Sequence, residues 1–189
     1  MSNINYLRWV ECDAGPHILL EKRLIASWEG VNKPRNGRVV IAKFRYGEES
    51  DPATDYDRAC DIEDYVGLIP VGDGNGLVIA DDVPKSTWIP ADDQKGGYLV
   101  ILNYIEEGTS DTTIINTVRE AREECFEPTD LKLPILDNTL YLFAACDNEP
   151  NWVYGFSEIQ IEPGTYTIDT IERHNFGDCS FRVHRLRKI

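Results

Sequence analysis

Two short apolar runs joined by a polar link constrain the fold of this chain most strongly. Tyr65–Val71 and Leu77–Ala80 are separated by the sequence GDGNG, residues 72–76. Glycine, asparagine and aspartate reach positive φ angles at little cost, so this link between apolar runs predicts a β-hairpin. The apolar character of both runs predicts that the hairpin is buried.

A dense run of acidic residues leads into this hairpin. Residues 48–64 contain a single cation, Arg58, and eight acids: Glu48, Glu49, Asp51, Asp55, Asp57, Asp61, Glu63 and Asp64. The whole chain carries 33 Asp and Glu against 19 Lys and Arg, a net charge of −14. Such a field repels nucleic acid and anionic membranes and speeds encounter with a basic partner or a cation. The alternative is that the acids serve solubility alone.

The remaining pattern predicts strands with one main helix. We expect a strand over Arg38–Tyr46, a short helix within Glu21–Glu29 that places Leu24, Ile25 and Trp28 on one side, and a central strand over Tyr98–Ile105. Ser110 or Asp111 can cap a helix that runs to about Phe126, and Pro128 would end it.

The chain changes character after Pro128. Four strands without an intervening helix are predicted, over Thr139–Cys146, Trp152–Ile161, Thr165–Glu172 and Cys179–Arg187. We therefore expect an α+β fold with mixed or antiparallel sheets, one main helix at about 110–126 and a β-rich C-terminal part. Residues 1–127 would form the α+β N-terminal part and 128–189 an all-β part packed on it, in a single compact unit of the 189 residues.

The cysteines and the N-terminus indicate the compartment. Five scattered cysteines without a CxxC motif predict reduced thiols and no metal site. The first residues have neither a basic nor an apolar signal region, and no apolar run approaches the ~18 residues of a membrane span. We expect a cytoplasmic protein that needs no cofactor.

Few residues point to catalysis. The three histidines are His17, His174 and His184. We expect His184 to share an exposed basic face with Arg182, and the paired carboxylates Asp55/Asp57, Asp81/Asp82 and Asp92/Asp93 to be solvated. Two alternatives to a binding protein remain open at this point: a small hydrolase with an Asp/His pair around His17, and a β-rich module for a small ligand.

Several motifs together resemble a known family. They are WVECDAGPHILL (Trp9–Leu20), YDRACDIEDYVGLIPVGDGNGLVIADD (Tyr56–Asp82), Thr87-Trp88-Ile89-Pro90, Pro163–Ile168 and Phe181–Leu186. The chain resembles the immunity protein 21 family of bacterial polymorphic toxin systems. It departs from the family pattern at Ala14, at His17 and in the longer Asp81–Pro84 segment. The resemblance implies a cytoplasmic antitoxin that binds and silences a cognate toxin, without an enzyme active site.

The family-like residues are expected to be mainly architectural: Trp9, Gly15, Pro16, Tyr56, Arg58, Cys60, Gly67, Pro70, Gly72 and Gly74. Arg58 would tie the acidic segment down through charge-assisted hydrogen bonds. Five basic residues gather near the C-terminus (Arg173, Arg182, Arg185, Arg187 and Lys188), and internal pairing with the acids is the simplest role for them.

Toxins that attack nucleic acid are commonly basic, so we expect the acids that flank the hairpin to form the contact surface. Trp88 would be an aromatic anchor in it, with core packing as the alternative. The predicted contact residues are Asp55, Asp57, Asp61, Glu63, Asp64, Asp81, Asp82, Trp88, Asp92 and Asp93. The identity of the toxin and the oligomeric state stay open.

Overall fold

Two antiparallel β-sheets make up most of the chain. The computed structural model describes residues 7–13, 15–31, 40–48, 50–91, 95–149, 152–177 and 179–189. The larger sheet has six strands in the order β1 (Val10–Glu11), β5 (Lys85–Pro90), β6 (Gly96–Tyr104), β11 (Cys179–Lys188), β10 (Gly164–Phe176) and β7 (Glu127–Ile135). The smaller sheet has five, in the order β3 (Val66–Val71), β4 (Gly74–Ile79), β2 (His17–Glu21), β8 (Thr139–Ala144) and β9 (Phe156–Gln160).

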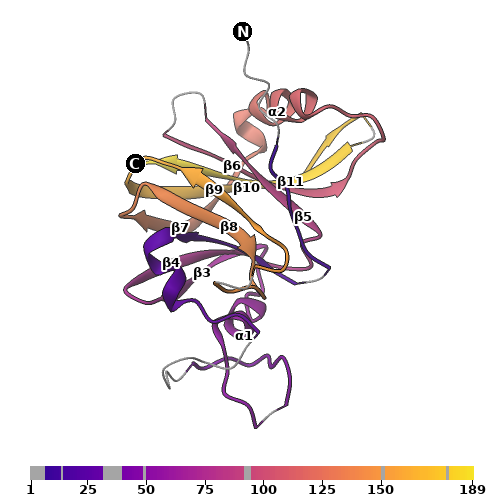
Figure 1. Cartoon of the computed structure of the whole chain (residues 1–189). Coiled ribbons are helices and arrows are strands. Elements are labelled where there is room, and N and C mark those ends of the chain that lie inside the picture. Colours follow the sequence, from indigo (N-terminus) through magenta and orange to yellow (C-terminus); the bar gives the residue numbers. More distant parts are fainter. Residues whose placement is uncertain are drawn as a thin grey trace.

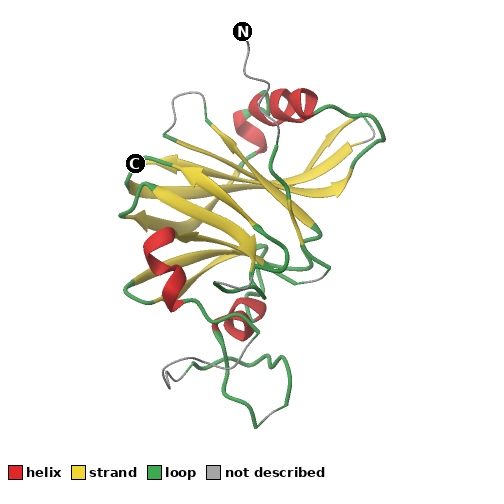
Figure 2. Cartoon of the chain, in the orientation of Figure 1, coloured by secondary structure: helices red, strands yellow, loops and turns green. Residues whose placement is uncertain are grey.

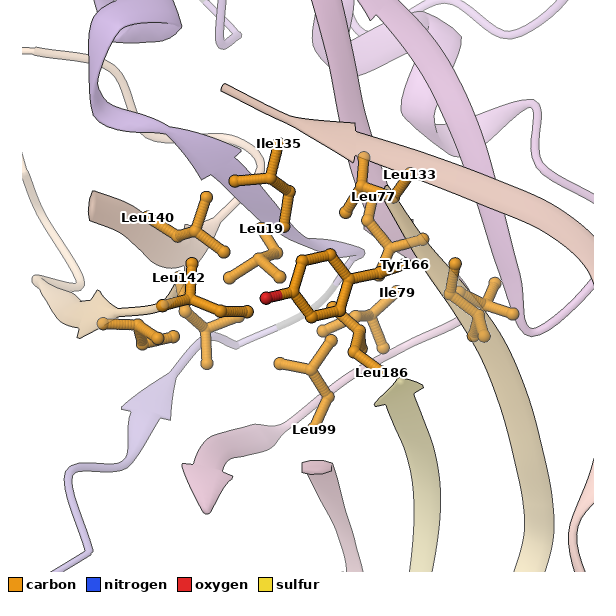
Figure 3. Packing of buried hydrophobic residues seen from close by; sticks show 14 of the residues in the cluster. Leu19, Leu77, Ile79, Leu99, Leu133, Ile135, Leu140, Leu142, Tyr166 and Leu186 are labelled. Atoms are coloured by element: carbon orange, nitrogen blue, oxygen red, sulfur yellow. The ribbon is translucent and has the colours of Figure 1, made fainter. Parts of the chain in front are cut away.

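The two sheets pack face to face over the central core. Alternate residues of each strand point into this space, as the period of two requires. Tyr166 of the larger sheet lies at its centre among leucines and isoleucines of both sheets (Figure 3). Its ring is fully buried, and its hydroxyl donates a hydrogen bond of 2.5 Å to the Glu162 carbonyl, so the one polar atom is satisfied.

Helices cover the outer faces of both sheets (Figures 1 and 2). The 3-10 helix η1 (Lys22–Ser27) and helix α1 (Asp55–Cys60) pack on the smaller sheet, and α2 (Asp111–Arg119) with η2 (Glu123–Cys125) lies against the larger one. Because helices also cover the outer side of the central strands, strands such as β2 and β6 are apolar on both faces. No helix among the described residues is long and apolar enough to cross a membrane.

The expectation of an α+β fold with a main helix is wrong, because the chain is β-rich. Helix α2 begins as predicted, with the Ser110 hydroxyl accepting a hydrogen bond of 3.1 Å from Thr113 N, but it ends at Arg119 and not near residue 126. Six of its nine residues are β-branched, and such residues are weak helix formers. The chain then turns through η2 and enters β7 at Glu127.

Strand β7 was not predicted, because Pro128 after an apolar helical spacing indicates the end of a helix. It contains both Pro128 and Pro134 and lies at the edge of its sheet, paired only with β10. Proline lacks the N–H of a ladder bond, and an edge strand tolerates this loss. A proline therefore excludes a central strand but not an edge strand.

The strand predicted over Arg38–Tyr46 is also wrong for the residues that the structure describes. Residues 40–46 form an irregular segment that leads away from the sheets on the side of α1 (Figure 1). The N–H groups of Lys43, Phe44 and Tyr46 bond to carboxylates and not to a neighbouring strand, as described below. Residues 38 and 39 lie outside the described part of the chain.

Other predictions are confirmed. The hairpin is formed by β3 and β4, although its turn is only Gly72-Asp73, and Gly74–Gly76 belong to β4. Gly72 has a φ of 58°. In the 3-10 helix region, Leu24, Ile25 and Trp28 are buried on one side.

The four C-terminal strands are present, but they do not form a separate sheet. Strands β8 and β9 join β2, β3 and β4, whereas β7, β10 and β11 join β1, β5 and β6. Each sheet thus combines strands from both sides of the proposed division at residues 127 and 128. That the chain unfolds as a single unit stays a prediction.

Candidate protein-binding site

The acids of helix α1 are structural. Asp55 is completely buried and Asp57 is 2% exposed, so the expectation that this pair is solvated is wrong. Thr54 and Asp57 form a reciprocal capping box, in which Asp57 Oδ2 accepts a hydrogen bond of 2.8 Å from Thr54 N. Asp55 Oδ2 accepts one of 3.1 Å from Glu29 N. The Thr-x-x-Asp spacing was visible in the sequence and could have predicted this cap.

Arg58 ties the acidic segment down, as predicted, and it also joins α1 to the hairpin. Its guanidinium donates to the Asp55 carboxylate and to the Pro70 carbonyl, which lies on β3. The arginine side chain is 23% exposed and the Asp55 side chain fully buried. The pair therefore neutralises a buried carboxylate and joins two elements.

Asp57 and Asp61 also hold the irregular segment 40–48. Asp57 Oδ1 accepts a hydrogen bond of 2.7 Å from Tyr46 N, and Asp61 accepts bonds from Lys43 N and, at 2.7 Å, from Phe44 N. The rings of Phe44 and Tyr46 then meet the Tyr56 ring edge-on, with centroids 6.5 and 5.7 Å away. The carboxylates of Asp57 and Asp61 thus accept the backbone hydrogen bonds that a neighbouring strand would otherwise accept from this loop.

Two exposed acids, Glu63 and Asp64, follow helix α1. Glu63 forms a surface ion pair of 3.3 Å with Lys43. Asp64 lines a hollow of about 440 Å³ that also contains Tyr65 and three further acids, Glu127, Asp130 and Glu172. We call Asp64, Glu127, Asp130 and Glu172 the acidic hollow. No lysine, arginine or histidine is among its described lining residues. No sequence pattern could have predicted that these four residues lie together, because they come from three segments that are far apart in the chain.

The remaining predicted contact residues are spread more widely. The Asp81 carboxylate lies 3.6 Å from Arg182, and Asp82 Oδ1 accepts a hydrogen bond of 3.1 Å from Gly15 N. Trp88 is partly buried against the central core, the alternative role considered for it. Asp92 and Asp93 lie outside the described residues.

Two histidines, His17 and His184, are buried and neutral. His17 Nδ1 lies 2.6 Å from Ser86 Oγ, and burial lowers the pKa of His17 to about 4. His184 Nδ1 lies 2.9 Å from Thr170 Oγ1, and burial lowers its pKa to about 3. The expected exposure of His184 is wrong, because the side of β11 opposite Phe181 and Val183 faces the other sheet and not solvent.

The basic residues near the C-terminus pair internally. Arg185 donates to Glu123 and, at 2.8 Å, to Asp169, while Arg187 contacts the same two carboxylates. Lys188 contacts Glu162. These pairs match the simplest role considered for the basic cluster.

A comparison with protein families decides the class of the chain. The family model Immunity protein 21 matches residues 8–174. The chain belongs to the immunity protein 21 family. The match confirms the resemblance seen in the sequence motifs, and it covers every element from β1 to most of β10. Searches of curated proteins and of solved structures found no match.

Proposed function

We propose that this immunity protein 21 member binds a cognate toxin domain and neutralises it by covering its active surface. Membership of the family over residues 8–174 is the observation that carries the proposal. We favour binding over catalysis as the mode of action, because His17, the histidine considered for a catalytic pair, is buried. His17 and Ser86 are both fully buried, so a substrate cannot reach the contact between them.

The charge of the chain supports a basic toxin. A net charge of −14 attracts cationic surfaces at long range and speeds association at low salt. Much of the positive charge near the C-terminus is paired with nearby carboxylates. These cations therefore do not neutralise the exposed acids elsewhere on the surface. We place the toxin contact on Glu63 and the acidic hollow, and we include Asp81 and Asp82 in it. Asp55 and Asp57 are buried and would affect binding only by stabilising the fold.

Reversal of charge on this surface tests the proposal. The triple variant Glu63→Lys, Asp64→Lys, Asp130→Lys changes three exposed side chains. The matched control reverses Glu124, Glu158 and Glu162, which are also exposed and which change the net charge equally. We expect association with the toxin domain at low salt to slow at least ten-fold in the first variant, and clearly less in the control.

Both variants should keep the melting temperature of the wild type within a few degrees, because exposed ion pairs contribute little to stability. Equal association rates for both triple variants would show that net charge alone steers the toxin. An unchanged rate in the first variant would place the contact elsewhere, and the basic C-terminal strand would then be the next surface to test.

A further inference from the structure

A second hollow lies between α1 and the segment after β8. It measures about 570 Å³, and three tyrosines (Tyr46, Tyr56 and Tyr154) are among its lining residues. We call it the tyrosine hollow. The other lining residues are Cys12, Asp13, Val31, Cys146, Asp147, Asn148 and Val153. Its rim is open to solvent, since Tyr46 is 60% and Val153 78% exposed.

The tyrosine hollow has an apolar floor and an acidic wall. The thiols of Cys12 and Cys146 lie 3.9 Å apart, and burial raises the pKa of Cys146 to about 12, so this thiol is uncharged at neutral pH. The Tyr154 hydroxyl donates a hydrogen bond of 3.0 Å to Asp13 Oδ2, and Tyr154 N donates one of 2.8 Å to Asp147 Oδ2. Two carboxylates are thus fixed beside three aromatic rings.

At three other described places the chain itself puts a cation beside an aromatic ring and a carboxylate. The Arg182 guanidinium lies 3.7 Å from the centre of the Tyr65 ring and next to Asp81. The Arg185 guanidinium lies 3.7 Å from the Phe126 ring and binds Asp169 and Glu123. Lys22 Nζ lies over the Tyr141 ring and next to Glu158. Each site combines an aromatic face, a carboxylate and a positive side chain.

The tyrosine hollow has the ring faces and the carboxylates without the cation. Among the described residues, no lysine or arginine forms an ion pair with Asp13 or Asp147 or lies over one of the three tyrosine rings. No basic residue is among the described lining residues. Its geometry suits a long cationic side chain, whose carbon stem would lie on the apolar floor while its charged group reaches the carboxylates.

We propose that the tyrosine hollow is an anchor site that receives an arginine side chain of the basic toxin domain. An arginine offers a planar cation for the tyrosine rings and several donors for Asp13 and Asp147. Arginine is also enriched among residues that dominate the binding energy of interfaces, and such residues sit in pockets that exclude water. Asp82, which bonds to Gly15 N next to this region, connects the hollow to the exposed acids of the hairpin. This inference rests on the proposed function.

A substitution that introduces a cation of the chain itself at the tyrosine hollow tests the inference. Val153→Arg places a cation of the chain itself at the rim, and Leu136→Arg is the matched control, because Leu136 is 69% exposed and outside the hollow. A second pair removes one charge without changing shape much: Asp13→Asn in the hollow and Glu124→Gln outside it. The probe is the C-terminal domain of the protein encoded by the neighbouring gene, titrated against each purified variant.

We expect Val153→Arg to weaken toxin binding at least ten-fold and Asp13→Asn about three- to ten-fold, mainly through faster dissociation. The controls should change the affinity by less than two-fold, and all four variants should melt like the wild type. A wild type that binds the toxin domain, together with a Val153→Arg variant that binds it equally well, would overturn the anchor site alone. A wild type that does not bind would overturn the proposed function and the anchor site with it.

Discussion

Two buried neutral histidines should make this fold sensitive to mild acid. In the unfolded chain a histidine has a pKa of ~6.5, whereas burial lowers the pKa of His17 to about 4 in the folded protein. Below pH ~6.5 the unfolded chain therefore binds a proton that folded His17 rejects. The stabilising contribution is fully present above pH ~6.5 and is lost as the pH falls toward 4.

The size of the effect follows from this difference in pKa. At pH 5 an unfolded histidine is almost fully protonated and folded His17 mostly neutral, which lowers the free energy of unfolding by about 2 kcal/mol relative to pH 8. His184 is shifted in the same direction by burial and should add a loss of similar size. We expect the wild type to lose about 4 kcal/mol between pH 8 and pH 5 from the two groups together.

Urea unfolding of His17→Asn, measured at intervals from pH 8 to pH 5, checks this reasoning. Asparagine can keep a hydrogen bond to Ser86 near the position of His17 Nδ1 but cannot take up a proton. The variant should be less stable than the wild type at pH 8 and should lose about 2 kcal/mol less on going to pH 5. Parallel stability curves for the two proteins would refute the account of His17 as a buried neutral base.

Further predictions concern the internal contacts. Arg58→Ala should lower the free energy of unfolding by about 1–3 kcal/mol, because it leaves Asp55 buried without its cation; an unchanged denaturation curve would show that the pair adds nothing. Arg185→Met should lower it by about 2–4 kcal/mol, since Asp169 keeps only Arg187; a smaller loss would mean that Arg187 suffices. Asp57→Asn should loosen segment 40–48 and speed its proteolysis, whereas equal cleavage rates would show that the carboxylate does not hold it. Limited proteolysis of the wild type near residues 127–130 should not give two separately stable fragments.

Local features of the fold could be predicted from the sequence. The hairpin of β3 and β4 follows from glycine and aspartate between apolar runs, and the cap at Ser110 follows from its position before Asp111. Both depend on residues within a few positions of one another. The end of α2 was missed because the apolar spacing continued past Arg119, where the chain no longer forms a helix.

Features that depend on distant segments could not be predicted. The side of β11 that carries His184 looked like an exposed face because nothing near it in sequence reveals the second sheet that covers it. The acidic hollow joins Asp64 to acids more than 60 residues away along the chain. Charge density alone selected Asp55 and Asp57 for the surface, although their carboxylates accept hydrogen bonds from the backbone N–H groups of Glu29 and Tyr46.

Titration of this protein with the C-terminal domain of the protein encoded by the neighbouring gene, the candidate toxin, tests the central claim most directly when toxin activity is followed in the same mixture. We predict a tight complex that weakens as salt rises, and a loss of toxin activity that parallels occupancy of the complex. The same domain should kill cells that lack this protein and spare cells that make it. Absence of binding at micromolar concentrations of both proteins, or a complex in which the toxin stays fully active, would contradict the claim that this chain neutralises a toxin by covering it.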